Sequence, residues 1–372
     1  MLKAPPNDSG TSRPSPICPR RFCRKKAGSV PASQFPTTPA QRWETSDQRR
    51  QASKTAMDFS RRTPNESSIL FEARAVDGGV GHCRTVLAGA TDVCTQTSQD
   101  ALNSCKVAGQ STYWQTLGMC ANLGDATSRQ TCQEKAQSVY HFSVDSCRAQ
   151  FKSRLGVCQR TDGGPYNPVI DPANFTINID NPYLPFKPGT TFVYAGPTSE
   201  GFQRNTTEVT FNTKVIEGVT CVEVHDQVYT NGQLTEDTLD WYAQDNEGNV
   251  WYFGEDSEEL SNGRVTTLGG TWQAGVNGAK PGIVMEAHPK VGDFYRQEFL
   301  LGTAEDTAGV LSLDQSVTVP AGTFDHCLET YEITGLEPGA LEHKYYSAGV
   351  GNVLTIDLVS GDRFPLVQIL KH

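Results

Sequence analysis

The sequence predicts an α+β protein, in which a disulfide-stapled antiparallel helical hairpin follows a disordered N-terminal region and precedes an antiparallel β-sandwich or barrel-like domain. Seven of the eleven cysteines fall at regular intervals between Cys83 and Cys158. From about residue 165, short runs rich in Val, Thr and aromatic residues alternate with turn-forming pieces. We therefore divide the chain of 372 residues into a basic region, 1–75, a Cys-rich αα-hairpin, 76–164, and a β-rich domain, 165–372.

The basic region holds fourteen Lys and Arg against six Asp and Glu and has few apolar residues. Such a composition buries too little apolar surface to offset the entropy lost on ordering, so we expect residues 1–75 to be disordered and dispensable. The first thirty residues lack the apolar core of a secretory signal, and a start near Met57 supplies none either. No transmembrane span is predicted, because no stretch approaches the roughly 18 to 20 apolar residues that a membrane helix needs.

Apolar and cysteine residues recur at three- and four-residue steps over His82–Leu123, which predicts one long helix with a soft point at Gly109. Gly124 is expected to end this helix and Asp125 to cap a second one, which runs to "TDGGPYNP". The turn between them makes an αα-hairpin.

The cysteine spacing is a mirror about this turn: steps of 11 and 15 residues on one helix are followed by 15 and 11 on the other. Cysteines at equal distance from the turn of an antiparallel hairpin lie at the same height, and these steps keep them near one seam. Zinc and iron–sulfur ligands usually come in closely spaced pairs, which are absent here. Buried reduced thiols are the other alternative. We predict the disulfides Cys94–Cys158, Cys105–Cys147 and Cys120–Cys132, with Cys83 left over.

The β-rich region carries the pieces "TNGQ", "DNEGN" and "SNGR" between strand-like runs, and these predict hairpin turns. "DWYAQDNEGNVWYFGED" is similar to a β-propeller turn, but its single copy favours a simple aromatic hairpin. Four of its aromatic residues and Trp272 either line a pocket for a hydrophobic ligand or form part of the core, and a core role is favoured. The four residues of the stretch are Trp241, Trp251, Tyr252 and Phe253. Cys221 and Cys327 are expected to be buried, with neighbouring strands as one arrangement, and a disulfide between them is an open alternative that burial does not require.

The phrases "YNPVIDPANF", "VTVPAGTFDHCLET" and "EHKYYSAGVGNV" resemble a group of uncharacterised exported bacterial proteins with no assigned function. The resemblance covers a little over half of the chain. It implies export and a β domain, and it brings no catalytic residues to carry over.

Charge excludes some partners. The chain has a net charge of −10 although its first 75 residues are basic, so the body is acidic and nucleic acid is not an expected partner. Residues 215–263 hold twelve acids and no Lys or Arg. A solvated acidic face is the favoured interpretation, because the run lacks the ligand register of an EF-hand.

Catalytic motifs are absent: the sequence contains no G-x-S-x-G, H-E-x-x-H, Walker A or helix-opening G-x-G-x-x-G element. Two histidines have acidic neighbours in sequence, His288 near Glu286 and Asp293, and His343 beside Glu342. Together they could form a two-His-one-carboxylate metal site or a general base. Adjacent strand residues point to opposite faces, so His343 and Glu342 would not act together, and ordinary histidines are favoured.

The sequence thus predicts an exported, non-enzymatic binding or structural module without cofactor, catalytic residue or metal site, whose partner is an unknown protein or a hydrophobic ligand. The cysteines place it in an extracellular or periplasmic compartment. The alternatives are a metal-dependent hydrolase that uses His288 and His343, and a thiol-rich metal-binding protein.

Overall fold

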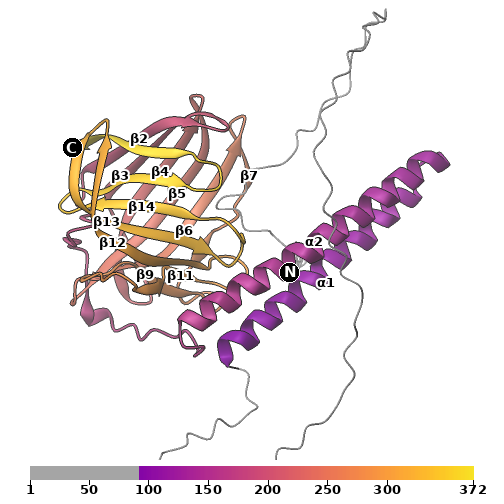
Figure 1. The fold of residues 1–372 in the computed structure, drawn as a ribbon, viewed down its shortest axis with the longest axis horizontal. Helices are drawn as coiled ribbons and strands as arrows, with labels where there is room; N and C mark the ends of the chain where they lie inside the picture. Colours follow the sequence, from indigo (N-terminus) through magenta and orange to yellow (C-terminus); the bar gives the residue numbers. More distant parts are fainter. Residues whose placement is uncertain (1–91) are drawn as a thin grey trace, which may run out of the picture. The chain divides into compact units, whose positions relative to one another are not determined.

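The computed structural model describes residues 92–372, which belong to one compact unit. The predictions for residues 1–75 and for Cys83 lie outside this range. Two helices come first, α1 (Val93–Ala121) and α2 (Ala126–Arg160), and they lie antiparallel side by side (Figure 1). Neither helix of the described residues has the length and apolar character needed to cross a bilayer.

Aspartates cap both helices at their N-termini. The Asp125 carboxylate accepts a hydrogen bond of 2.8 Å from the Ser128 N–H, which confirms the predicted cap of α2. The Asp92 carboxylate accepts one of 2.6 Å from the Thr95 N–H, so α1 begins at Val93. The part of the predicted helix before residue 92, from His82 onward, lies outside the described residues.

Three disulfides join the helices in the predicted pairs, Cys94–Cys158, Cys105–Cys147 and Cys120–Cys132. Their Cα–Cα distances are 5.5, 5.8 and 5.5 Å, within the range that unforced disulfides span. The mirror spacing is thus confirmed as a ladder along the seam.

Helix α1 continues without a break through Gly109, where the sequence predicts a soft point. A Cβ atom at this position would lie 2.6 Å from Ser143 Oγ on α2. The glycine therefore marks a close approach of the two helices between the Cys105–Cys147 and Cys120–Cys132 disulfides.

All sixteen strands of residues 92–372 join one antiparallel sheet, which curls into a nearly closed barrel (Figure 1). The main path runs β10-β12-β13-β14-β15-β16-β2-β3-β4-β5-β6-β9-β11, and its two ends approach each other where β10 meets β9 and β11 meets β12. After the 3₁₀ turn η1 (Pro172–Asn174), the strands are β1 (Phe175–Thr176), β2 (Thr190–Thr198), β3 (Gly201–Ile216), β4 (Val219–Thr230), β5 (Gln233–Asp245), β6 (Val250–Ser261), β7 (Arg264–Thr267), β8 (Trp272–Gln273), β9 (Lys280–Met285), β10 (Phe294–Arg296), β11 (Glu298–Phe299), β12 (Asp306–Val319), β13 (Gly322–Thr334), β14 (Glu342–Ser347), β15 (Gly351–Asp357) and β16 (Arg363–Lys371).

The hairpin turns form where the Asn-Gly pairs predict them. Asn231 and Gly232 connect β4 to β5 with φ of 52° and 79°, and Asn262 and Gly263 connect β6 to β7 with φ of 52° and 70°. Both residues of each pair adopt the left-handed conformation that a tight two-residue hairpin requires. The aromatic hairpin β5–β6 turns through "DNEGN", where the Asp245 carboxylate accepts a hydrogen bond of 2.8 Å from Trp251 Nε1.

Two clusters of buried apolar side chains fill the β domain. One contains Trp241, Tyr252, Phe253 and Trp272, with Trp251 packed against it, so the favoured interpretation of these aromatics as core is confirmed. Cys221 lies in this cluster and Cys327 in the other, both as buried free thiols. Their strands, β4 and β13, are not neighbours in the sheet, and the two thiols are not joined by a disulfide.

Candidate functional site

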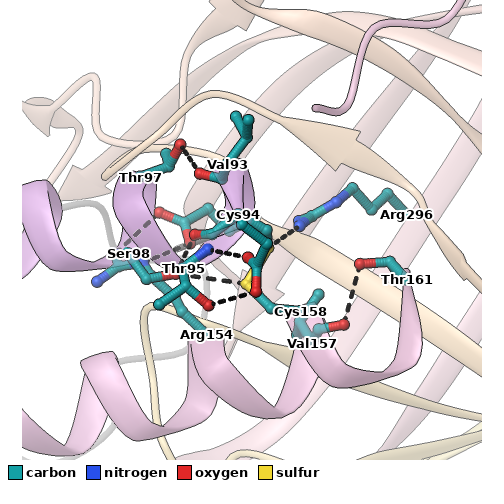
Figure 2. The surroundings of a disulfide bond; sticks show 12 residues. Val93, Cys94, Thr95, Thr97, Ser98, Arg154, Val157, Cys158, Thr161 and Arg296 are labelled. Atoms are coloured by element: carbon teal, nitrogen blue, oxygen red, sulfur yellow. Dashed lines mark hydrogen bonds and ion pairs between the residues drawn. A yellow bond between two sulfur atoms is a disulfide. The ribbon is translucent and has the colours of Figure 1, made fainter. Parts of the chain in front are cut away.

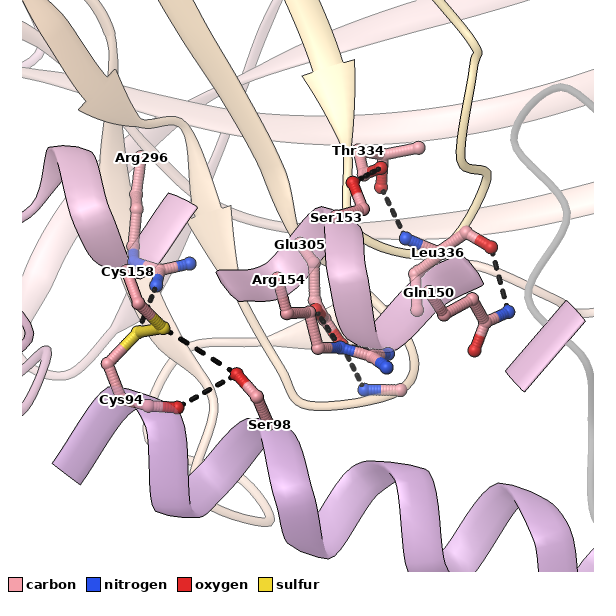
Figure 3. Close-up of polar contacts among 11 residues, drawn as sticks. Cys94, Ser98, Gln150, Ser153, Arg154, Cys158, Arg296, Glu305, Thr334 and Leu336 are labelled. Carbon is pink, nitrogen blue, oxygen red and sulfur yellow. Dashed lines mark hydrogen bonds and ion pairs between the residues drawn. A yellow bond between two sulfur atoms is a disulfide. The ribbon is translucent and has the colours of Figure 1, made fainter. Parts of the chain in front are cut away.

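One face of α2 packs on the β domain through its C-terminal half (Figure 3). Gln150 Nε2 donates a hydrogen bond of 2.8 Å to the Leu336 carbonyl oxygen, and the Ser153 hydroxyl donates one of 3.3 Å to the Thr334 carbonyl oxygen. Arg160 lies 3.9 Å above the centre of the Phe294 ring. These contacts come from one stripe of α2, so the helix docks over residues 150–160 and not at a single point.

A buried ion pair forms the centre of this contact. Arg154 Nε and Nη2 donate to the two carboxylate oxygens of Glu305 at 2.7 and 2.8 Å, with both side chains at least 93% buried (Figure 3). The same carboxylate accepts a hydrogen bond of 2.7 Å from the Gly302 N–H. Gly335 covers the pair so closely that a Cβ atom there would lie 2.7 Å from Glu305 Oε2. Two parallel charge-assisted hydrogen bonds fix the helix against the β domain in one geometry.

Arg296, at the end of β10, reaches the hairpin from the other side of this junction. Its Nη2 donates to Cys94 Sγ at 3.7 Å, and Ser98 Oγ lies 3.6 Å from Cys158 Sγ (Figure 2). The guanidinium also lies 4.9 Å from the centre of the Phe299 ring. Burial lowers the pKa of Arg296, and the Glu305 carboxylate opposes that shift, so the side chain keeps its positive charge.

A cavity of about 160 Å³ lies between the hairpin and the β domain at this junction. Arg154, Arg296 and Glu305 line it together with the Cys94 end of the outermost disulfide. Most of its remaining wall is apolar, from Val93, Val157, Tyr166, Phe299 and Leu301.

Beyond the docked end, the hairpin carries large apolar side chains in contact with solvent. Trp114 is 62% exposed and Phe142 is 77% exposed, and between the helices the Tyr113 and Tyr140 rings stack with centroids 5.0 Å apart. The exposed set also includes Val107, Met119 and Val139. The β domain also exposes large apolar side chains, among them Phe202 and Phe211 on β3, so the hairpin differs by carrying an exposed tryptophan.

The structure does not bring His288 and His343 into a metal site. No group of three His, Cys, Asp or Glu side chains in residues 92–372 is arranged to hold a metal ion. His288 is exposed in the loop between β9 and β10, whereas His343 Nδ1 is 2.8 Å from Glu329 Oε1 on β13. Glu342, next to His343, is buried and lies near Lys344 instead, as expected for adjacent strand residues.

Glu286, the carboxylate of the predicted set, is partly buried near Asp293. Burial raises the pKa of Glu286 to about 7, and the Asp293 charge adds to that shift, so Glu286 holds a proton below that pH. Burial likewise raises the pKa of Glu342 to about 7, against the opposing charge of Lys344. Lys344 Nζ is 2.5 Å from Glu332 Oε2 and 3.7 Å from Glu342 Oε2. These groups neutralise one another within the β domain.

The acidic run, residues 215–263, is not wholly a solvated face. Asp240 and Glu255 are buried on the paired strands β5 and β6, and the Tyr252 hydroxyl donates to the Asp240 carboxylate. Asp226 and Asp237 engage polar neighbours, including His225, whose Nε2 lies 2.5 Å from Asp237 Oδ1. The prediction erred because alternation along a strand turns part of any uniform charge run inward.

Sequence reasoning missed the three charged residues of the junction. Arg154 carried a detectable signal, since it lies seven residues after Cys147 and four before Cys158, on the stripe that the cysteines place at the seam. A charge at such a position needs a buried partner. Nothing in the sequence identifies that partner as Glu305, 151 residues away, or brings Arg296 to the same place.

The chain matches no protein-family model and no curated protein in sequence. Among solved structures, it is similar to the crystal structure of "a putative lipoprotein from Parabacteroides distasonis ATCC 8503", with a TM-score of 0.28 and 14% sequence identity. That similarity covers 50% of this chain and 97% of the other. A likeness at this level assigns neither fold nor function, which we argue from the chain itself.

Proposed function

We propose that this protein is a non-enzymatic binding module of an extracellular or periplasmic compartment, in which the stapled hairpin presents an apolar surface to a protein partner. The observation that carries the proposal is the ladder of three disulfides along the hairpin. Disulfides persist in oxidising compartments, and three of them hold a helix pair that has little core of its own.

The distribution of side chains supports an interaction role for the hairpin. The hairpin exposes Trp114 and Phe142 to solvent although it has few buried apolar residues of its own, whereas the β domain has two apolar clusters and exposes Phe202 and Phe211. Buried aromatic anchors supply much of the energy of protein interfaces, and a rigid helix pair holds them without a large entropic cost on binding. The docked face of α2 keeps the hairpin fixed to the β domain through Arg154 and Glu305.

Site-specific photo-crosslinking in the cells that produce the protein tests this function. A photoreactive phenylalanine analogue at Phe142 is expected to give one discrete crosslinked species. The matched control carries the analogue at Gln137, an exposed polar residue of the same helix. If Phe142 gives no adduct, or if both positions give the same set, the hairpin surface does not bind a specific partner.

A further inference from the structure

The cavity at the junction of hairpin and β domain holds an excess of positive charge in an otherwise acidic protein. Arg154 and Glu305 neutralise each other, but no carboxylate of residues 92–372 lies within ion-pair distance, 4.0 Å, of Arg296. The chain as a whole carries a charge of −10. An unpaired cation at a partly buried site is costly unless an anion accompanies it, so this cavity favours anions over neutral molecules.

A second cation of the cavity is also incompletely satisfied. Arg154 Nη1 is buried and has no hydrogen-bond partner among residues 92–372, although the other two guanidinium nitrogens are bonded to Glu305. Buried donors of a charged group rarely remain unpaired in proteins, because each costs the free energy of its lost hydration. The two guanidinium groups line one cavity, and the partly exposed Arg296 is the one that an acceptor can reach.

Three features of the cavity indicate the chemical class of the acceptor that it would bind. The planar fork of a guanidinium matches a carboxylate, with which it forms two parallel hydrogen bonds. The apolar wall formed by Val157, Phe299 and Leu301 would leave the oxygens of an inorganic anion without partners but suits a hydrocarbon tail. A volume of about 160 Å³ limits the ligand to a few carbon atoms or one ring.

We infer that the cavity between α2 and the β10 region binds a small organic carboxylate, whose charged end meets Arg296 and whose apolar end lies against Val157 and Phe299. This site is separate from the exposed hairpin surface at Trp114 and Phe142. A test of carboxylate binding is therefore independent of a test of the proposed protein partner.

Calorimetric titration of the intact protein with benzoate and butyrate, at constant ionic strength, tests the inference. Benzamide and butyramide are the uncharged isosteres, and inorganic phosphate is the control for a general anion. We expect benzoate or butyrate to bind with a dissociation constant of about 1 mM or lower. The amides are expected to bind at least about tenfold more weakly, since a charge-assisted hydrogen bond is lost.

The variant Arg296→Gln removes the unpaired charge, and we expect it to weaken carboxylate binding about tenfold or more. The matched control Arg264→Gln removes an exposed arginine of β7 and is expected to leave binding unchanged. Equal binding of acid and amide to the unaltered protein overturns the inference even if Arg296→Gln fails to fold. Preferential binding of phosphate, equal losses in the two variants, or no carboxylate binding near 1 mM also overturns it.

Discussion

At the scale of single residues, the ion pair between Arg154 and Glu305 decides how the two parts of the chain meet. Both side chains are buried, and the carboxylate also accepts the Gly302 N–H. Desolvation of two charges offsets much of their attraction, so the pair contributes specificity of geometry more than net stability. Either charge left alone in the same place would be strongly unfavourable.

Replacing one partner is therefore expected to cost more than replacing both. Arg154→Met should lower the free energy of unfolding by about 3 to 5 kcal/mol, because it leaves the Glu305 carboxylate buried without a counter-charge. The double variant Arg154→Met/Glu305→Leu should recover a large part of that loss. Urea unfolding of the four proteins of this cycle measures the coupling, and strictly additive losses would contradict a buried, mutually dependent pair.

The pH dependence of stability provides a second test at this scale. The pKa of Glu286 is about 7 in the folded protein and near 4.5 in the unfolded chain. Between these values the folded state holds a proton that the unfolded state releases, so this group makes the free energy of unfolding fall as the pH rises from about 4.5 to 7. Glu342 acts with the same sign over the same window.

Glu286→Gln removes one of these two titrations, and we expect the melting temperature of the variant to fall less than that of the unaltered protein between about pH 5 and pH 8. Differential scanning calorimetry at several pH values measures the two slopes. Glu208→Gln is the control, because Glu208 is an exposed glutamate on β3. A slope that both variants change equally would show that Glu286 does not hold a proton near neutral pH.

At the scale of elements, the hairpin is a helix pair whose disulfides replace part of a core. Only nine residues of α1 and α2 are buried, four on the first helix and five on the second. The cross-links restrict the unfolded chain and favour the native pairing of the helices. The three disulfides are nested, so each one closes only a short loop of chain once the other two have formed. We therefore expect them to contribute similar amounts to the free energy of unfolding.

Removal of the middle disulfide with Cys105→Ser/Cys147→Ser is expected to lower the free energy of unfolding by about 2 to 4 kcal/mol. Circular dichroism during chemical unfolding follows the helices directly. The comparison protein is Cys221→Ala, which removes a free thiol of the β domain. An unchanged unfolding midpoint in the double serine variant would mean that the helices associate without that staple.

The sequence predicted the helical hairpin and the tight turns better than it predicted the closure of the barrel and the junction. The disulfide pairs follow from cysteine positions alone, because an antiparallel hairpin converts equal distances from the turn into contact. The Asn-Gly turns are similarly local, since Asn231 and Gly232 need only their own left-handed conformation. The barrel and the junction cavity instead depend on residues far apart in the chain, such as β2 against β16 and Arg154 against Glu305, whose pairing no local pattern encodes.

At the scale of the whole molecule, the hairpin is not a spacer that leaves the β domain free. Its C-terminal half shares buried contacts with the β domain, and a lined cavity lies between the two. Arg296 on β10 also contacts the Cys94–Cys158 disulfide, so the β domain meets the stapled end of the hairpin at more than one point. A partner of the hairpin and a ligand of the cavity would then meet the same rigid body.

The account as a whole depends on the disulfide ladder, because rigidity, compartment and proposed function all follow from it. Peptide mapping without reduction, on protein isolated from its native source with free thiols blocked at lysis, tests that ladder directly. We predict three linked peptide pairs, Cys94–Cys158, Cys105–Cys147 and Cys120–Cys132, with Cys221 and Cys327 free. Six blocked thiols in place of these pairs, or any other connectivity, would contradict the account.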